Sequence, residues 1–283
     1  MILVGLAGWG DHDSIYAKGI KPRDKLREYS RSYPLVEVDS SFYAIQSKER
    51  MEVWANDTPE HFQFVVKAYQ GMTGHLRSKP YYESSQLMYE AFCESIEPLI
   101  DTNKLKAVLF QYPPWFNCTR ENVHILKETK ERMKSIPCAL EFRHQSWFLP
   151  EFSNKTLAFM EEQGWIHSIC DEPQAGVGSV PSVLHATHPK VTVIRMHGRN
   201  VSGWNQGGAA NWREVRYLYD YNNDELSEWR DHILKLGTHT QEVCIIFNNN
   251  SGGHAAHNAT QLMILLGLQT LDQTTPEQLD LFE

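Results

Sequence analysis

The stretch CALEFRHQSW, residues 138–147, has the composition of a buried β-strand that becomes charged at its carboxyl end. Glu141 and Arg143 are two positions apart, and residues i and i+2 project from the same face of a strand. Charged side chains are rarely buried without a partner. The two residues are therefore expected to belong to one ionic network on the inner face of a sheet.

Eight short runs of this kind, including the one above, are spread along the chain, and segments of helical length separate most of them. The predicted strands are residues 2–8, 35–43, 62–68, 106–114, 137–143, 165–173, 191–199 and 242–250, and the predicted helices are 22–33, 81–100, 121–134, 154–164, 223–237 and 257–268. This alternation predicts an α/β fold, a parallel eight-stranded sheet closed as a TIM (β/α)8 barrel. A doubly wound open sheet is the alternative, but no Walker sequence and no G-x-G-x-x-G follows the first run.

The domain organisation predicted is one TIM-barrel domain over residues 1–270 and a flexible polar tail over residues 271–283. The length of 283 residues suits a single barrel. A Gly, Asn and Trp-rich stretch, residues 198–215, follows the seventh run, where a barrel places a mobile active-site loop.

Charge and cysteine usage narrow the class of protein. With 27 Lys and Arg against 35 Asp and Glu, the formal charge of −8 gives no overall cationic field for nucleic acid or an anionic membrane, although a local basic groove stays open. The five cysteines are odd in number and scattered, which favours a reducing compartment. No secretory signal or membrane span is recognisable. We expect a cytoplasmic protein with no membrane partner.

Polar residues gather where the predicted strands end, and in a barrel these ends share one mouth. Glu37 and Glu141 are candidate acids or bases, and His197 is a candidate proton carrier near neutral pH. Lys67, Arg143 and Arg195 are candidate binders of an anionic substrate. Further candidates for substrate binding are Trp9, Asn248 and Asn249, where the alternatives are aromatic packing and backbone hydrogen bonding.

A purely structural ionic network is the alternative to a functional one, because buried ion pairs also occur for stability. No metal ligands are predicted. Glu, Asp and His from several strands are able to hold a divalent metal, but tight ligand spacing is missing and neighbouring Arg and Lys would compete for the carboxylates. The cofactor is left unknown.

Several sequence blocks resemble one known family in content and order: GLAGWG, VEVDSSFY, TPEHFQFVVKA, LFQYPPWF, LEFRHQSW, IRMHGRN and IFNNNSGGHAAHNA. The chain resembles the YecE-like family, domain of unknown function 72, over about residues 4–268. The resemblance implies a TIM barrel and points to the candidates Trp9, Glu37, Lys67, Glu141, Arg143, Arg195, His197, Asn248 and Asn249. It implies no particular reaction.

The tail carries a separate motif, QLDLF. It resembles the pentapeptide with which bacterial replication and repair proteins dock on the DNA sliding clamp, and its candidate partner-binding residues are Gln278, Leu279, Asp280, Leu281 and Phe282. The alternative is that these apolar side chains fold back onto the barrel.

Three functions remain open from the sequence. The first is an enzyme of phosphoester or acid-base chemistry that acts on a phosphate-bearing or otherwise anionic substrate, such as a nucleic acid end, and is recruited by the clamp. The second is an enzyme acting on a small anionic metabolite, a sugar phosphate or a carboxylate. The third is a non-catalytic binding or adaptor protein.

Overall fold

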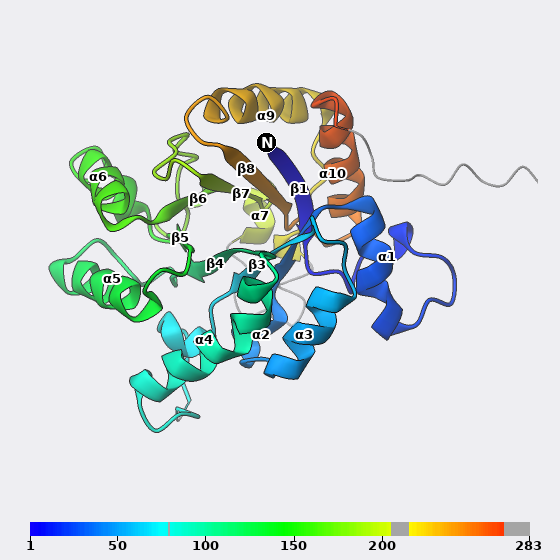
Figure 1. The fold of residues 1–283 in the computed structure, drawn as a ribbon. Coiled ribbons are helices and arrows are strands. Elements are labelled where there is room, and N and C mark those ends of the chain that lie inside the picture. The colour runs from blue at the N-terminus through cyan, green and yellow to red at the C-terminus, as the bar shows by residue number, and fades with distance from the viewer. Residues whose placement is uncertain (79, 205–214, 269–283) are drawn as a thin grey trace, which may run out of the picture.

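The computed structural model describes residues 1–78, 80–204 and 215–268, which form a closed barrel of parallel strands (Figure 1). Its strands are β1 (Ile2–Ala7), β2 (Leu35–Val38), β3 (Gln63–Lys67), β4 (Leu105–Gln111), β5 (Cys138–Glu141), β6 (Ile166–Asp171), β7 (Val191–Met196) and β8 (Glu242–Phe247). Each strand pairs in parallel with the next one in sequence, and β8 pairs with β1 to close the ring. The predicted single TIM barrel is confirmed.

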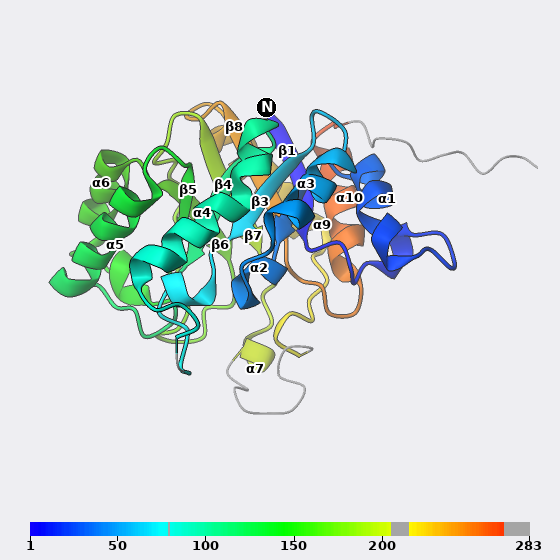
Figure 2. The same cartoon turned by 60° about the horizontal axis from the view of Figure 1, so that its bottom comes forward.

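The described helices surround the barrel on its outside, except α7, which lies at its mouth (Figure 1 and Figure 2). They are α1 (Lys25–Ser32), α2 (Ser40–Tyr43), α3 (Lys48–Asn56), α4 (Ser85–Asp101), α5 (Arg120–Met133), α6 (Ser153–Gln163), α7 (Val201–Trp204), α9 (Asn223–Leu236) and α10 (His254–Leu265). Helix α3 is absent from the predicted set, although its apolar side chains recur at Met51, Trp54 and Ala55 and Ser47 caps it by accepting from the N–H of Arg50.

Local capping explains where several helices begin and end. Ser84 and Thr119 each accept a hydrogen bond from the backbone N–H three residues later, at the start of α4 and α5. Asn222 and Glu225 form a reciprocal capping box that starts α9. Gly164 takes the left-handed conformation that ends α6, which glycine adopts without strain.

Two apolar layers hold the fold together. The outer layer lies between strands and helices and includes Val36, Leu140 and Ile194. Each of these directly precedes an inward-facing charged residue, and neighbouring residues of a strand point to opposite faces. The inner layer fills the barrel with Leu3, Ala7, Leu35, Val65, Ala107, Leu109, Ala139, Ile166, Val191, Val193, Cys244 and Ile246. A filled interior leaves the end of the barrel as the place for a site.

The second predicted strand is too long. The prediction extends this strand over residues 35–43, but β2 ends at Val38 and Ser40–Tyr43 form α2, so Ser41 lies on a helix. The Ser41 hydroxyl donates instead to the carbonyls of Val38 and Lys67 at 2.7 and 2.6 Å. A short polar side chain that bonds nearby backbone competes with strand pairing.

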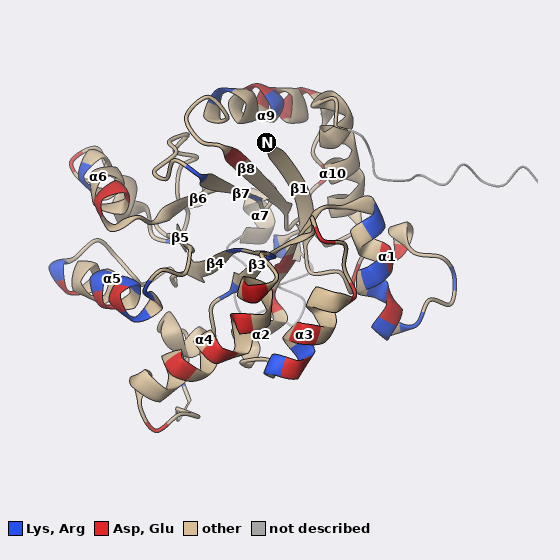
Figure 3. Ribbon diagram, in the orientation of Figure 1, with Lys and Arg blue, Asp and Glu red and all other residues tan. Residues whose placement is uncertain are grey.

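At the mouth, α7 lies beyond the carboxyl ends of the strands (Figure 2). Lys and Arg are interspersed with Asp and Glu on α1, α3, α5 and α9, whereas α4 carries acidic residues only (Figure 3). Among the described helices, none combines the length and apolar character needed to cross a membrane. The predicted tail, residues 271–283, with its clamp-like motif, lies outside the described residues.

Candidate functional site

The candidate site is the polar top layer of the barrel interior. On five strands, the residue two positions after an inward apolar residue is polar. The pairs are Leu35 and Glu37, Val65 and Lys67, Leu109 and Gln111, Ala139 and Glu141, and Val193 and Arg195. Residues i and i+2 share a face, so these polar side chains all start from the inner face near the mouth.

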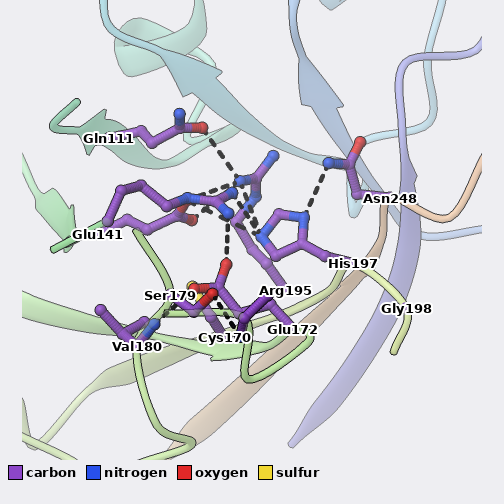
Figure 4. A network of polar contacts seen from close by, with 12 residues as sticks. Gln111, Glu141, Cys170, Glu172, Ser179, Val180, Arg195, His197, Gly198 and Asn248 are labelled. Atoms are coloured by element: carbon purple, nitrogen blue, oxygen red, sulfur yellow. Dashed lines mark hydrogen bonds and ion pairs between the residues drawn. The ribbon is translucent and has the colours of Figure 1, made fainter. Parts of the chain in front are cut away.

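A buried chain of ion pairs crosses this layer, in the order Glu37, Arg195, Glu141, Arg143 and Glu172; Figure 4 shows part of it. Arg195 donates from Nε and Nη2 to the carboxylate of Glu37 at 2.8 and 2.6 Å, and from Nη1 to Glu141 at 2.9 Å. Arg143 donates from Nε to Glu141 at 2.6 Å and from Nη1 to Glu172. All five side chains are buried, and each guanidinium lies between two carboxyl groups of the chain.

The three carboxyl groups of this chain differ in acidity. Burial raises the pKa of Glu37 to about 8, although the guanidinium of Arg195 opposes the shift and nearby Asp39 adds to it. Burial also raises the pKa of Glu172 to about 7 against the charge of Arg143. The pKa of Glu141 moves in the opposite direction. Burial favours its neutral form, but together the guanidinium groups of Arg143 and Arg195 outweigh burial and lower the pKa to about 2. Glu141 is therefore fixed as a carboxylate.

His197 lies on top of the same network and has both ring nitrogens engaged. Its Nε2 is 2.9 Å from Nη2 of Arg143, and since a guanidinium only donates, this nitrogen accepts. The proton of the neutral ring then sits on Nδ1, which is 2.9 Å from Nδ2 of Asn248. Because two donors do not bond each other, we assign the Asn248 amide in its flipped orientation, with the oxygen facing Nδ1. Burial, followed by the charges of Arg143 and Arg195, holds the pKa of His197 well below its usual range.

The role of His197 as a proton carrier stays a prediction; its contacts hold the ring in a fixed orientation. A ring that is neutral at physiological pH and bonded on both sides orients Arg143 and Asn248. We therefore describe His197 as a positioning residue.

A cavity of about 700 Å³ opens above the ion pairs at the mouth. It is lined by Asp11, Asp39, Phe42, Tyr43, Lys67, His75, Gln111, Pro114, Arg143, Gly178, Arg216, Tyr217, Asn248, Asn250 and Ser251. Three of these are cations: Lys67, Arg143 and Arg216. Asp39 brings a carboxylate to the same cavity, with Oδ1 3.8 Å from Nζ of Lys67.

The segment after β7 reaches this site through Trp204. The guanidinium of Arg216 lies 3.8 Å from the centre of the Trp204 ring, and that of Arg143 lies 5.6 Å from it. Both are within the range of cation–π attraction. The first part of the predicted active-site loop, up to Trp204, therefore lies at the mouth. Residues 205–214 of this loop are not among the residues that the structure describes.

One group of described side chains has metal-ligand geometry: an oxygen of Glu141, the sulfur of Cys170 and a nitrogen of His197 lie within 4.8 Å of one another. The same carboxylate and ring atoms already accept from Arg143 and Arg195. A divalent cation placed there would meet two guanidinium charges at hydrogen-bond distance, and burial raises the pKa of the Cys170 thiol, which opposes thiolate ligation. These residues do not fit a metal ion.

The predicted site residues fall into three groups. Lys67, Arg143 and Asn248 line the cavity, while the buried residues beneath it are Glu37, Glu141, Arg195 and His197. The other two lie elsewhere. Trp9 packs edge-on against Trp54 at 5.0 Å, and the buried Asn249 donates to Tyr219 and Asn258. The clamp-motif residues Gln278, Leu279, Asp280, Leu281 and Phe282 are outside the described chain.

Asp39, two positions after Glu37, lines the cavity and is not among the predicted site residues. Five further residues lie at the site and are not among them: His75, Gln111, Glu172, Arg216 and Tyr217. Gln111 ends β4 on the inner face, so the i+2 rule that identified Glu37 would have found it. Glu172 directly follows β6 and shares that signal. The other three come from segments between strands, where no periodicity fixes the direction of a side chain.

Comparison with known proteins agrees with this architecture. A family model described as protein of unknown function DUF72 matches residues 3–280. The UPF0759 protein YunF of Bacillus subtilis (strain 168) is 53% identical over 283 residues and covers all of both chains. A crystal structure of a DUF72 family protein from Enterococcus faecalis V583 is 41% identical, covers 99% of this chain and 100% of its own, and superposes with a TM-score of 0.90. One from Thermotoga maritima MSB8 is 29% identical, covers 94% and 99%, and has a TM-score of 0.80.

Proposed function

This chain belongs to the DUF72 family of proteins of unknown function, and from that premise we propose that it is an enzyme that binds a small anionic substrate at the mouth of its barrel and acts on it by proton transfer. Phosphate and carboxylate are the anionic groups that arginine and lysine recognise best.

The observation that carries this proposal is the way Arg143 is held. Of its five N–H groups, three donate to Glu141, Glu172 and His197, which fix the plane of the guanidinium from below. Two N–H groups remain on a side chain that lines the cavity. A rigid donor of this kind loses little freedom when it binds an anion, and Lys67 and Arg216 add positive charge on the same cavity.

Asp39 supplies the group for proton transfer. Asp39 lines the cavity, whereas Glu37 is buried in the barrel interior beneath it. Burial raises the pKa of Glu37 to about 8, so this carboxyl holds a proton more strongly than an exposed one. In the proposed step Asp39 accepts a proton from the substrate, the carboxyl of Glu37 exchanges protons with it, and Lys67 and Arg143 stabilise the negative charge that develops. Glu141 and Arg195 hold these groups in place and touch no substrate.

Size and charge favour a small substrate over duplex nucleic acid. A cavity of about 700 Å³ is in the range that encloses metabolites. The formal charge is −8, which disfavours a phosphate backbone, and the Lys and Arg residues on α1, α3, α5 and α9 are interspersed with Asp and Glu (Figure 3). We therefore favour a sugar phosphate or a carboxylate.

The test is proton exchange with solvent. The protein is incubated in D2O with pools of phosphorylated and carboxylated metabolites, and deuterium incorporation is followed by NMR. We expect exchange in at least one compound, a loss of at least about 100-fold in Asp39→Asn, and no change in Asp101→Asn, an exposed carboxylate on α4. A protein that binds these compounds but exchanges and converts none of them would be a binding or adaptor protein instead.

Docking on the DNA sliding clamp is a second proposal, and it rests on the motif Gln278 to Phe282 alone. If it holds, the substrate is a nucleic acid end or a nucleotide released from one. A cytoplasmic location accompanies both proposals and is supported by the five cysteines, all of which are free thiols. Recovery of the expressed chain in a membrane pellet would contradict that location.

A further inference from the structure

A file of aromatic rings leads from the cations of the cavity to the protein surface. Nζ of Lys67 lies 4.8 Å from the centre of the Phe42 ring. Phe42 contacts His75 edge-on at 5.1 Å, and His75 contacts Trp115 at 5.8 Å. Phe42, Tyr43 and His75 line the cavity, and we call these three together with Trp115 the aromatic shelf.

The outer end of the aromatic shelf is open to solvent. Trp115 is 51% exposed and Tyr43 55%, whereas Trp147 on the neighbouring loop is 1% exposed and donates its indole N–H to the carbonyl of Phe116. Packing therefore accounts for Trp147 and not for Trp115. Large exposed aromatic surface beside a polar cavity is typical of a stacking site.

The charges around the aromatic shelf fit an anionic ligand with a ring. The guanidinium of Arg77 lies 4.7 Å from the centre of the Trp115 ring, so the outer end also carries positive charge. His75 is neutral, because burial and then the charge of Lys67 lower its pKa to about 4, and Thr73 bonds its Nδ1 at 2.8 Å. The middle of the shelf is thus an uncharged surface between two cationic ends.

We propose that the substrate joins its anionic group to a ring with a flat apolar face, and that this ring stacks on the aromatic shelf at Trp115 while the anionic group meets Lys67 and Arg143. The inference deepens the proposed function and rests on it. A sugar ring and a nucleobase share this chemistry, since both offer a face to an aromatic side chain.

Calorimetric titration separates the ring from the anion. Inorganic phosphate, glucose 6-phosphate and adenosine monophosphate are titrated into the wild-type chain, Trp115→Ala and Tyr81→Ala. Tyr81 is the matched control, because it is 84% exposed and does not line this cavity. We expect one of the ring compounds to bind about 5- to 100-fold more tightly than phosphate to the wild type.

Trp115→Ala should lose that gain while its phosphate affinity stays unchanged, Trp115→Phe should keep most of it, and Tyr81→Ala should behave as wild type. The ring compound that binds more tightly than phosphate shows whether the stacked ring is a sugar or a base. Equal affinity for all three compounds, or a gain that survives in Trp115→Ala, overturns the stacking site and leaves the anion site standing. Failure of phosphate itself to bind overturns both the inference and the proposed function.

Discussion

At the scale of single residues, Glu141 is the centre of the ionic network, and the two guanidinium groups beside it favour its ionised form. Its two oxygens accept from Arg143, Arg195 and the hydroxyl of Ser168, and its pKa of about 2 keeps it ionised. The sequence identified its position through the spacing to Arg143 but could not separate an acid from a structural anion. That distinction depends on how many cations surround it, which only the fold brings together.

Removing this charge should destabilise the protein. In Glu141→Gln a neutral amide faces two buried guanidinium groups, and the loss of one partner from such a network costs about 3–5 kcal/mol of unfolding free energy. The measurement is urea unfolding. The control is Glu161→Gln, which alters a surface pair with His185 and should leave the midpoint unchanged. A cost below about 1 kcal/mol for Glu141→Gln would show that Arg143 and Arg195 do not depend on it.

Burial raises the pKa of Glu37 to about 8 and that of Glu172 to about 7, and these shifts predict a pH dependence of stability. The folded chain holds protons that the unfolded chain has already released, so stability falls as pH rises through these values. Histidines with lowered pKa act in the opposite sense, but only below about pH 6.5.

Between pH 7 and 8.5 we therefore expect the free energy of unfolding to fall by about 1–2 kcal/mol, and by less than half of that in Glu37→Gln. Urea unfolding at both pH values measures the difference. Equal slopes in the two proteins would mean that Glu37 is ionised throughout this range.

At the scale of elements, the strand period explains what could be predicted. In the mostly apolar strands β2, β5 and β7 a charged residue stands two positions after an inward apolar residue, so the inward direction of Glu37, Glu141 and Arg195 follows from the i, i+2 spacing. Segments between strands have no such period. The cavity contacts of His75 and Arg216 therefore could not be derived, and the spacing did not show that Trp9 packs on Trp54 or that Asn249 donates to Tyr219.

The closeness of β1 and β2 gives a prediction about an element. Gly5 on β1 faces Leu35 on β2, and a Cβ atom at Gly5 would lie 1.9 Å from the Leu35 carbonyl oxygen. Gly5→Ala should therefore force the two strands apart and cost about 3 kcal/mol or more. Thermal unfolding measures it, with Gly10→Ala as the control, because a Cβ there meets nothing within 4 Å. An unchanged melting temperature for Gly5→Ala would show that the strands separate without cost.

At the scale of the whole molecule, the barrel was predictable because eight apolar runs and the segments between them leave few topologies open. Binding of a partner by the tail is a separate question, because residues 271–283 lie outside the described part of the chain. Full-length protein should bind purified bacterial sliding clamp with a micromolar dissociation constant, on the order of other short apolar motifs. A chain ending at Thr275 should not bind. Equal binding of both forms, or of neither, would remove the clamp from the account.

The most direct test of the central claim is calorimetric titration of inorganic phosphate into the wild type, Lys67→Gln and Lys155→Gln. Lys67 lines the cavity, whereas Lys155 is exposed on α6 outside it. A charged hydrogen bond is worth about 1.5–3 kcal/mol, so Lys67→Gln should weaken binding about 10- to 100-fold while Lys155→Gln leaves it unchanged. Phosphate that binds all three proteins equally, or none, would contradict an anion site at the mouth of the barrel.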